Sequence, residues 1–164
     1  MREMIFFHKP EEENGYLSNW YPSQFKAEGR LYSSMEQYMM HQKAVAFGDP
    51  DIGSDIMYCS DPQEIQRLGK LVQGFSETVW DGIKQIIVYR GLLEKFRQNP
   101  DLKEKLLATQ GKMLAECSIS DKIWGIGLSM TDQRRFDIGA WKGQNLLGFA
   151  LMEVRNLMLR NEVL

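Results

Sequence analysis

The fold is decided by the segment Tyr32-Ser33-Ser34-Met35-Glu36-Gln37-Tyr38-Met39-Met40-His41-Gln42-Lys43-Ala44. It predicts a helix that follows a β-hairpin, because Ser33 and Ser34 are good N-cap residues and the spacing Ser33-x-x-Glu36 fits a capping box. Glu36, Met40 and Lys43 then follow the i, i+4, i+7 spacing that puts side chains on one helical face. A carboxylate and an amine that share this face are candidates for the floor of a site.

A purely structural interpretation of these residues stands beside the functional one. In that interpretation Glu36 only closes the capping box, and Lys43 lays its alkyl stem along a half-buried helix with its amine in water. Spacing alone favours the structural interpretation, so the functional one depends on the rest of the chain.

Length and composition restrict the class of protein. The chain has 164 residues and a formal net charge of −2, which predicts one domain, residues 1–164, without a general attraction for nucleic acid. No apolar run is long enough to span a membrane. Cys59 and Cys117 form no CxxC pair, and His8 and His41 are far apart in sequence. We therefore expect neither a metal site nor a disulfide framework, and a reducing cytoplasm as the location.

Apolar runs and turn residues predict the elements of the first third of the chain. Residues 4–7 form a strand, and a hairpin around Glu28-Gly29 leads into the helix that starts near Ser34. Gly48-Asp49-Pro50 ends this helix, and a loop is expected to run on through Gly53.

The rest of the chain is predicted to be mainly helical. Asp61-Pro62 starts a helix that reaches about Gln73, residues 76–99 form the longest helix, and a shorter helix follows it. The expected apolar face of the longest helix contains Val79, Ile83, Ile86, Ile87, Arg90, Leu93 and Phe96. Residues 112–117 form a strand that we expect to pair with the hairpin, and Asn145 caps the last helix. The last helix buries Leu147, Leu151, Val154 and Met158. The fold class is α+β, a mostly helical domain with a small antiparallel sheet.

Residues 121–144 form a loop rich in glycine that precedes the last helix. Free backbone N–H groups and the macrodipole at a helix N-terminus favour a phosphate or carboxylate. The alternative is an ordinary surface loop, in which Trp124 covers the core instead of stacking on a base. No Walker or dinucleotide-binding pattern is present.

Blocks along nearly the whole chain resemble the NADAR family, the YbiA-like domain. The blocks in this sequence are Leu17-Ser18-Asn19-Trp20, Ser34-Met35-Glu36-Gln37-Tyr38 with Gln42-Lys43-Ala44, residues 92–99, Leu106-Leu107-Ala108-Thr109, Asp121-x-x-Trp124-Gly125-x-Gly127 and Gly143-x-Asn145-x-Leu147-Gly148-x-x-Leu151-Met152-x-x-Arg155. They occur in order, and together they are specific.

The resemblance implies an N-glycosidase that needs no cofactor and separates an amine-bearing base from ribose. Two substrate classes are associated with the family. One is the phosphoribosylamino-pyrimidine intermediates of riboflavin biosynthesis, and the other is ADP-ribose attached to guanine in nucleic acid. A module that binds NAD or ADP-ribose without cleaving it is a further alternative. No membrane partner is expected, and no oligomeric state follows from the sequence.

The resemblance also implies roles for individual residues. Glu36 matches the general acid/base and Lys43 the covalent nucleophile. The substrate-binding residues that it implies are Asn19, Trp20, Tyr38, Trp124, Gly125, Gly127 and Asn145. Gly143 and Asn145 are assigned to the turn into the last helix and to a phosphate contact. We expect Arg155 to pair with an acidic neighbour rather than with substrate.

The sequence departs from the family pattern near the proposed site. Gln37 stands where relatives often have histidine, and Met40-His41 replaces a commoner Gln-Ala. The loop at residues 128–142 is longer than expected and carries Arg134 and Arg135, which are candidates for contact with a diphosphate or a nucleic-acid backbone. These departures concern the choice of substrate more than the class of reaction.

Overall fold

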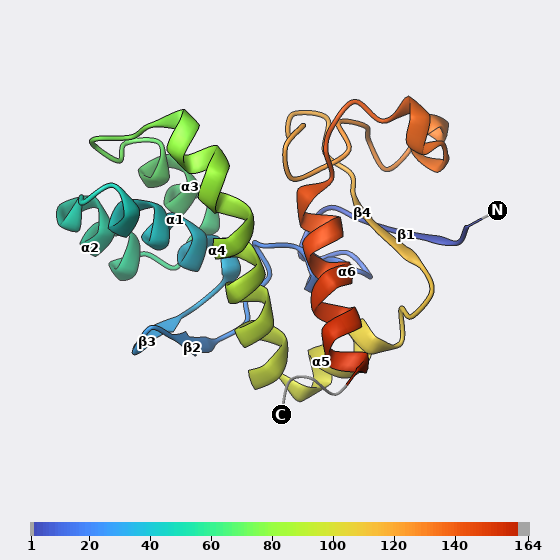
Figure 1. Cartoon of the computed structure of the whole chain (residues 1–164), viewed down its shortest axis with the longest axis horizontal. Coiled ribbons are helices and arrows are strands. Elements are labelled where there is room, and N and C mark those ends of the chain that lie inside the picture. Colours follow the sequence, from blue (N-terminus) through green and yellow to red (C-terminus); the bar gives the residue numbers. More distant parts are fainter. Residues whose placement is uncertain (1, 161–164) are drawn as a thin grey trace. The chain divides into compact units, whose positions relative to one another are not determined.

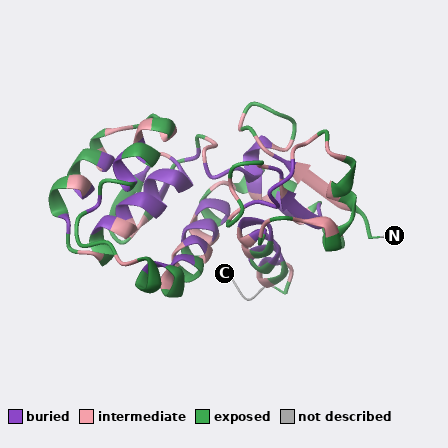
Figure 2. Ribbon diagram, turned by 90° about the horizontal axis from the view of Figure 1, so that it is seen from above, coloured by how far each residue is buried: buried purple, intermediate pink, exposed green. Residues whose placement is uncertain are grey.

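The computed structural model describes residues 2–160 and contains two compact units (Figure 1). By their place in the sequence alone, we call residues 22–99 the inner unit and residues 1–21 with 100–164 the outer unit. In both units buried residues gather at the centre and exposed ones around the outside (Figure 2). Helices dominate, and the strands form two small sheets. The predicted α+β class is confirmed.

The inner unit is organised around one helix, α1. Its elements are β2 (Phe25–Ala27), β3 (Arg30–Tyr32), α1 (Met35–Ala46), α2 (Pro50–Tyr58), α3 (Pro62–Gly69) and α4 (Glu77–Gln98). The strands β2 and β3 form the predicted antiparallel hairpin. Helices α2, α3 and α4 all pack against α1, and α4 also packs on β2 (Figure 1). Residues of α1 are therefore surrounded on most sides by the rest of the unit.

The start of α1 differs from the predicted capping box. Ser34 is the N-cap residue, and its hydroxyl accepts a hydrogen bond from the backbone N–H of Gln37 at 3.2 Å. The side-chain oxygen of Gln37 accepts from the backbone N–H of Ser33 at 2.7 Å. The box is thus shifted by one residue, and the predicted pair of Ser33 with Glu36 is wrong. Gln37 does the capping that the structural interpretation had assigned to Glu36.

Helix α2 occupies residues that we expected to be a loop. Asp49 is its N-cap, with Oδ1 accepting from the backbone N–H of Ile52 at 3.1 Å, and Pro50 takes the first helical position. Gly53, which pointed to a loop, lies inside the helix, where an added Cβ would be 3.5 Å from the Cβ of Ala44. The expected loop through Gly53 is therefore wrong, because the Asp-Pro pair starts a new helix as well as ending α1.

Two further predictions about the inner unit need correction. Helix α3 ends at Gly69 rather than near Gln73. In α4 the buried stripe is rotated from the predicted apolar face, since Val79 and Ile86 are half exposed. The residues that α4 buries are Trp80, Lys84, Val88, Gly91, Leu92, Lys95 and Phe96. Because two lysines and a glycine belong to this stripe, the spacing of apolar residues in the sequence does not reveal it.

The outer unit contains a parallel two-stranded sheet. Its strands are β1 (Met4–Phe7) and β4 (Met113–Glu116), paired from Met4 opposite Met113 to Phe7 opposite Glu116. We expected β4 to pair with the hairpin, which is wrong. Four residues, three of them buried, do not specify a partner strand.

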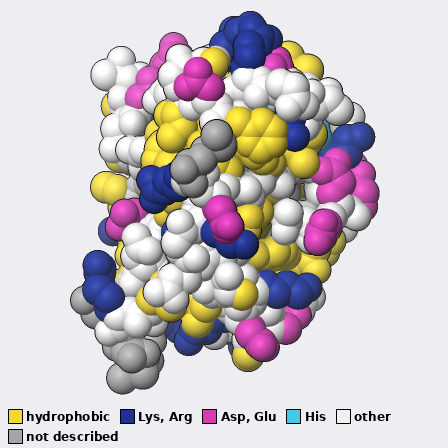
Figure 3. Space-filling model, turned by 90° about the vertical axis from the view of Figure 1, so that its right-hand side faces the viewer, with side chains coloured by type: hydrophobic (Ala, Val, Ile, Leu, Met, Phe, Trp, Pro, Cys, Tyr) yellow, Lys and Arg dark blue, Asp and Glu magenta, His cyan; other side chains and the backbone are white. Residues whose placement is uncertain are grey.

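Helix α6 (Leu146–Leu159) packs against β4 and α5 (Pro100–Leu107). It buries the predicted Leu147, Leu151, Val154 and Met158. Short 3₁₀ helices occur at η1 (Gly15–Leu17), η2 (Gln133–Phe136) and η3 (Ile138–Ala140). Figure 3 shows a side of this unit on which hydrophobic side chains gather among charged ones. Among the described residues, no helix has the length and apolar character that crossing a membrane requires.

Candidate active site

Glu36 and Lys43 lie on one face of α1, as their spacing predicts. Glu36 is only 4 % exposed, and Lys43 is half-buried. The Nζ atom of Lys43 donates a hydrogen bond to the backbone oxygen of Gly69 at 2.8 Å. Burial lowers the pKa of the Lys43 amine, the charge of Glu36 raises it, and the charge of Lys70 lowers it. The structure thus brings the predicted carboxylate and amine into electrostatic contact.

The close approach of α3 to α1 depends on the absence of a side chain at Gly69. An added Cβ there would be 2.0 Å from the Sδ atom of Met40, well inside contact distance. Met40 shares the face of Glu36 and Lys43. This packing brings the last turn of α3, and with it the Gly69 carbonyl, to the lysine.

Two aromatic rings surround the Lys43 amine, and the sequence alone had not singled them out. Nζ lies 4.4 Å from the ring centroid of Phe75 and 5.7 Å from that of Trp80. Phe47 meets Phe75 edge-on, with ring centroids 5.3 Å apart. Phe75 is 44 % exposed, whereas Trp80 is buried. In the sequence, the one signal for Phe75 is that an aromatic residue stands directly before the N-cap Ser76.

This arrangement can perform nucleophilic chemistry. An amine whose pKa is lowered has a larger unprotonated fraction at neutral pH than an exposed lysine, and only that form attacks carbon. A carboxylate on the same face can accept and return a proton. The aromatic rings exclude water from one side of the amine. Within residues 2–160, no group of three or more His, Cys, Asp or Glu side chains could hold a metal ion.

Asn19 and Trp20 lie in the outer unit, directly after η1. The Asn19 side chain is 6 % exposed, and its Oδ1 has no hydrogen-bond partner among the described residues. Buried polar atoms are nearly always paired, so this oxygen calls for a partner such as a water molecule or a ligand. Trp20 is partly exposed, and its backbone N–H donates to the Ser18 hydroxyl at 3.2 Å.

The glycine loop of the outer unit folds back on the start of α6. Backbone N–H groups of Asn145, Leu146 and Leu147 donate to the carbonyls of Gly125, Ile123 and Trp124 at 3.0–3.2 Å. The N–H groups that we expected to be free for an anion are therefore used by the loop itself. That expectation is wrong for the first residues of this helix.

The glycines of this loop allow close backbone contact. An added Cβ at Gly125 would be 2.9 Å from the carbonyl oxygen of Glu116, and Gly127 has a positive φ of 71°. Trp124 is partly exposed, and its backbone N–H donates to the Asp121 carboxylate at 2.8 Å. The structure thus explains the glycines by packing, and the contact of Trp124 with substrate stays a prediction.

Asn145 and Tyr38 have visible structural roles. The fully buried Asn145 amide donates to the carbonyl of Leu114 and accepts from the N–H of Glu116, both at 3.0 Å, so it holds α6 on β4. Tyr38 is 2 % exposed and meets Tyr32 edge-on, with ring centroids 5.1 Å apart. It lies two residues from Glu36 and points to another side of α1. Their contacts with substrate stay predictions.

Within residues 2–160, Arg155 forms no ion pair with an acidic neighbour, contrary to the prediction. Its Nη1 donates at 2.8 Å to the carbonyls of Thr109 and Lys112. This buried arginine closes the turn between α5 and β4, which is a structural role.

Comparison with known proteins identifies the family of this chain. The model of the NADAR domain matches residues 5–159. The chain belongs to the NADAR family. It is 43 % identical over 159 residues to "N-glycosidase R617" of Acanthamoeba polyphaga mimivirus, covering 92 % of this chain and 94 % of that one. It is 30 % identical to "N-glycosidase YbiA" of Escherichia coli, with 93 % and 86 % of the two chains covered.

A solved structure and a longer relative extend this comparison. The NMR structure of E. coli YbiA matches with a TM-score of 0.81 at 28 % identity, over 98 % of this chain and 88 % of that one. The "Riboflavin biosynthesis protein VVA0006" of Vibrio vulnificus is 32 % identical, with 94 % of this chain but 38 % of that protein covered. Since the NADAR match spans both units, we keep one domain, residues 1–164, as a proposal.

The residues at which this NADAR chain departs from the expected pattern have defined contacts. The Gln37 side-chain nitrogen donates to the carbonyls of Ile56 and Cys59 at 3.1 and 2.8 Å, which fixes the end of α2 on α1. Met40 packs on Gly69. The Nδ1 atom of His41 lies 2.9 Å from the Tyr32 hydroxyl. Of these, only Met40 lies on the face of Lys43.

Proposed function

We propose that this protein hydrolyses the bond between ribose C1 and an exocyclic amine, in phosphoribosylamino-pyrimidine intermediates of riboflavin biosynthesis. The observation that carries the proposal is the half-buried amine of Lys43, whose pKa burial lowers, on the same face as the buried Glu36. The names of the relatives, two N-glycosidases and a riboflavin biosynthesis protein, support it. At this identity the chain is a hydrolase that acts on N-glycosyl bonds.

The first half of the reaction replaces one C–N bond by another. A ribosylamine opens to an imine between C1 and the base nitrogen. The unprotonated amine of Lys43 adds to C1, and the C1–N bond to the base then breaks. The base nitrogen takes a proton as it leaves, and Glu36 is the group that supplies it. Lys43 is left joined to C1 as a Schiff base.

The second half uses one water molecule. Glu36, now a carboxylate, takes a proton from the water that adds to C1. The C1–Nζ bond breaks, the sugar leaves as its aldehyde, and Lys43 is restored as an amine. The sum is substrate and water to free base and ribose 5-phosphate. The family resemblance assigns Asn19 to substrate binding, and its buried Oδ1 has no hydrogen-bond partner among residues 2–160.

The ion pair of Arg134 with Asp132 favours a monophosphate substrate over ADP-ribose. Arg134 pairs with the Asp132 carboxylate at 2.7 Å, and Arg135 donates to the Asp132 carbonyl at 3.0 Å. Arg134 thus has its partner already, whereas the buried Nε of Arg135 has none among the described residues. A module that binds without cleaving has no use for a lysine whose pKa is lowered beside a carboxylate.

The test measures ribose 5-phosphate release from the phosphoribosylamino-pyrimidine, with wild type beside Glu36→Gln. We expect release by wild type and a loss of roughly 10²–10⁴-fold in the variant, the usual size of general acid–base catalysis. Borohydride added during turnover should reduce the Schiff base and attach the sugar to Lys43, which peptide mass spectrometry locates. Release without trapping at Lys43 contradicts the covalent step. No release by folded wild type contradicts the substrate assignment and directs the assay to ADP-ribosylated guanine.

A further inference from the structure

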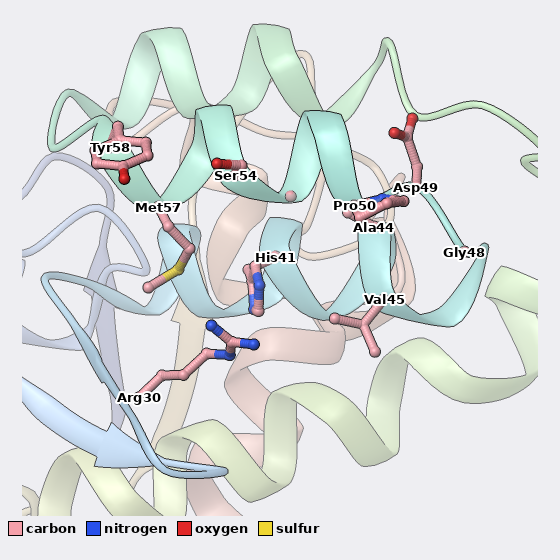
Figure 4. Close-up of a pocket in the computed structure, with 11 residues that line it drawn as sticks. Arg30, His41, Ala44, Val45, Gly48, Asp49, Pro50, Ser54, Met57 and Tyr58 are labelled. Carbon is pink, nitrogen blue, oxygen red and sulfur yellow. The ribbon is translucent and has the colours of Figure 1, made fainter.

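A second cavity of the inner unit lies away from Lys43. It has a volume of about 480 Å³, and its walls include Arg30 of β3, His41 of α1, and Ser54 and Tyr58 of α2 (Figure 4). His41 and Lys43 are two residues apart on α1, so their side chains point about 200° from one another around the helix axis. The cavity and the candidate active site therefore use opposite sides of α1.

The hydrogen bonds of His41 determine which ring nitrogen carries the proton. The side-chain nitrogen of Gln42 donates to the hydroxyl oxygen of Tyr32 at 3.3 Å. We assign Tyr32 as the donor to Nδ1 of His41, 2.9 Å away, because this gives the Tyr32 proton an acceptor. Burial lowers the pKa of His41, and the nearby charge of Arg30 lowers it further, so the ring is neutral near pH 7. A neutral ring that accepts at Nδ1 carries its proton on Nε2 and donates there.

Arg30 adds a positive charge on the same side. Its guanidinium is turned toward the His41 ring (Figure 4). Among the described residues, Arg30 forms no ion pair and no side-chain hydrogen bond. Two donor groups from different elements thus meet at one cavity, one of them charged. The hydroxyls of Ser54 and Tyr58 are further polar groups of its wall.

The one carboxylate in the wall, that of Asp49, already has two backbone donors. Asp49 accepts from the backbone N–H of Ile52 at 3.1 Å and from that of Gln73 at 2.8 Å. These two bonds turn its oxygens away from His41 and Arg30, as Figure 4 shows. On the side of the cavity near His41, the polar groups are therefore hydrogen-bond donors, namely His41 and Arg30.

We propose that this cavity is a second ligand site, separate from the Lys43 site, which binds the phosphate group of a small phosphorylated compound. A guanidinium binds two oxygens of a phosphate at once, and Nε2–H of His41 supplies a donor from another direction. A phosphate monoester has three oxygens that can accept hydrogen bonds from these donors, whereas a carboxylate has two. The cavity is also larger than a bare phosphate ion, which leaves room for a group of sugar size.

The histidine count makes the test direct. The chain has two histidines, His8 and His41, so side-chain ¹⁵N–¹H spectra contain two imidazole spin systems, and His8→Gln assigns them. Inorganic phosphate, ribose 5-phosphate and acetate are titrated into the full chain. We expect the Nε2 signal of His41 to shift saturably with both phosphate compounds and not with acetate at equal concentration. No shift with phosphate, or an equal response to acetate, overturns the proposal.

Four variants complete the test. Arg30→Gln should weaken phosphate binding by roughly tenfold or more, because a charged hydrogen bond is lost. Arg90→Gln is the matched control, since Arg90 is also exposed and lines a different cavity of the inner unit. Tyr32→Phe removes the hydrogen bond at Nδ1 of His41 and should change the ¹⁵N shift of that nitrogen. Lys43→Arg should bind phosphate like wild type. Equal binding by Arg30→Gln, or loss in Lys43→Arg, contradicts a separate site.

Discussion

Two clusters in this protein place a cation over a phenylalanine that a second phenylalanine meets edge-on. In the inner unit, Lys43 Nζ lies 4.4 Å from the centroid of Phe75, and Phe47 meets that ring at 5.3 Å. In the outer unit, Arg135 Cζ lies 4.3 Å from the centroid of Phe136, and Phe6 meets that ring at 5.2 Å. The two phenylalanines below the cations are 44 % and 46 % exposed.

The difference between the clusters is whether the cation can lose its proton. An arginine stays protonated in proteins, and Arg135 uses its guanidinium to hold the Asp132 carbonyl at 3.0 Å. Phe136 and Phe6 then attach η2 to β1. Lys43 can become a neutral amine, because burial lowers its pKa. Almost the same geometry therefore stabilises a loop in one unit and prepares a nucleophile in the other.

Exchanging the two cations has the largest expected effect. Lys43→Arg keeps a positive charge over Phe75 but removes the amine, so kcat/KM should fall by roughly a thousandfold or more, as for a lost covalent nucleophile. Arg135→Lys keeps a cation over Phe136 and should leave kcat/KM within about twofold of wild type, since nothing reactive is removed. Base release and borohydride trapping measure both. A Lys43→Arg variant that still turns over would show that the amine is not the nucleophile.

Lys95 is a second lysine that lies near an aromatic ring and has a lowered pKa, but it is not a candidate catalytic residue. Its Nζ lies 5.2 Å from the Phe96 centroid, but it is 0 % exposed, so no substrate reaches it. Burial lowers the pKa of Lys95 to about 7. Between about pH 7 and 10.4 the unfolded chain then binds the extra proton, and the free energy of unfolding should rise with pH by up to about 1.4 kcal/mol per unit.

Lys95→Met should remove this slope, measured by urea unfolding at pH 7, 8 and 9. Lys84→Met is the control, because Lys84 is also buried on α4 but pairs with Asp81 at 2.6 Å. We expect that variant to keep the slope. If the free energy of unfolding still rises with pH in Lys95→Met, the rise comes from a group other than Lys95.

Features of the sequence that act locally predicted the structure well. The hairpin turn at Glu28-Gly29, the caps Ser34, Asp61 and Ser76, and the apolar stripe of α6 depend on residues close in sequence. Glu36 and Lys43 were placed on one face by helical spacing alone, and the family resemblance supplied their roles.

What the sequence did not predict depends on contacts between distant segments. Met113–Glu116 pairs with β1 because of long-range packing, which its own four residues do not encode. Phe75 reaches Lys43 from a loop that is separated from α1 by the two helices α2 and α3, so no periodicity connects the two. Helix α2 was missed for another reason. Gly48-Asp49-Pro50 marks both a helix end and a helix start, and Gly53 favoured a loop.

Truncating the two rings should separate function from stability. Phe75→Leu removes a cation–π contact of about 0.5–2 kcal/mol at the Lys43 amine. Above the pKa of this amine, where it is neutral before it attacks, the ring no longer stabilises the positive charge that develops on Nζ, so kcat/KM should fall roughly two- to thirtyfold with little change in Tm. Phe136→Leu removes an aromatic pair of about 0.5–1.5 kcal/mol and should lower Tm with kcat/KM unchanged. Steady-state kinetics and thermal unfolding on both variants provide the comparison. The opposite assignment of the two losses contradicts the roles given to the clusters.

The smallest expected effect concerns the charges around Lys43. Glu36 raises the pKa of Lys43 and Lys70 lowers it, so Lys70→Gln should leave the amine protonated up to a higher pH. Because only the neutral amine attacks, the rise of kcat/KM with pH should move slightly toward alkaline pH. Arg67→Gln is the control, since Arg67 is also an exposed cation of α3 but pairs with Glu64 at 2.6 Å. High salt should screen Lys70 and reproduce the shift in wild type, whereas it should shift Lys70→Gln less. A profile that moves toward acid in Lys70→Gln would mean that the titration seen in kcat/KM belongs to a group other than the Lys43 amine.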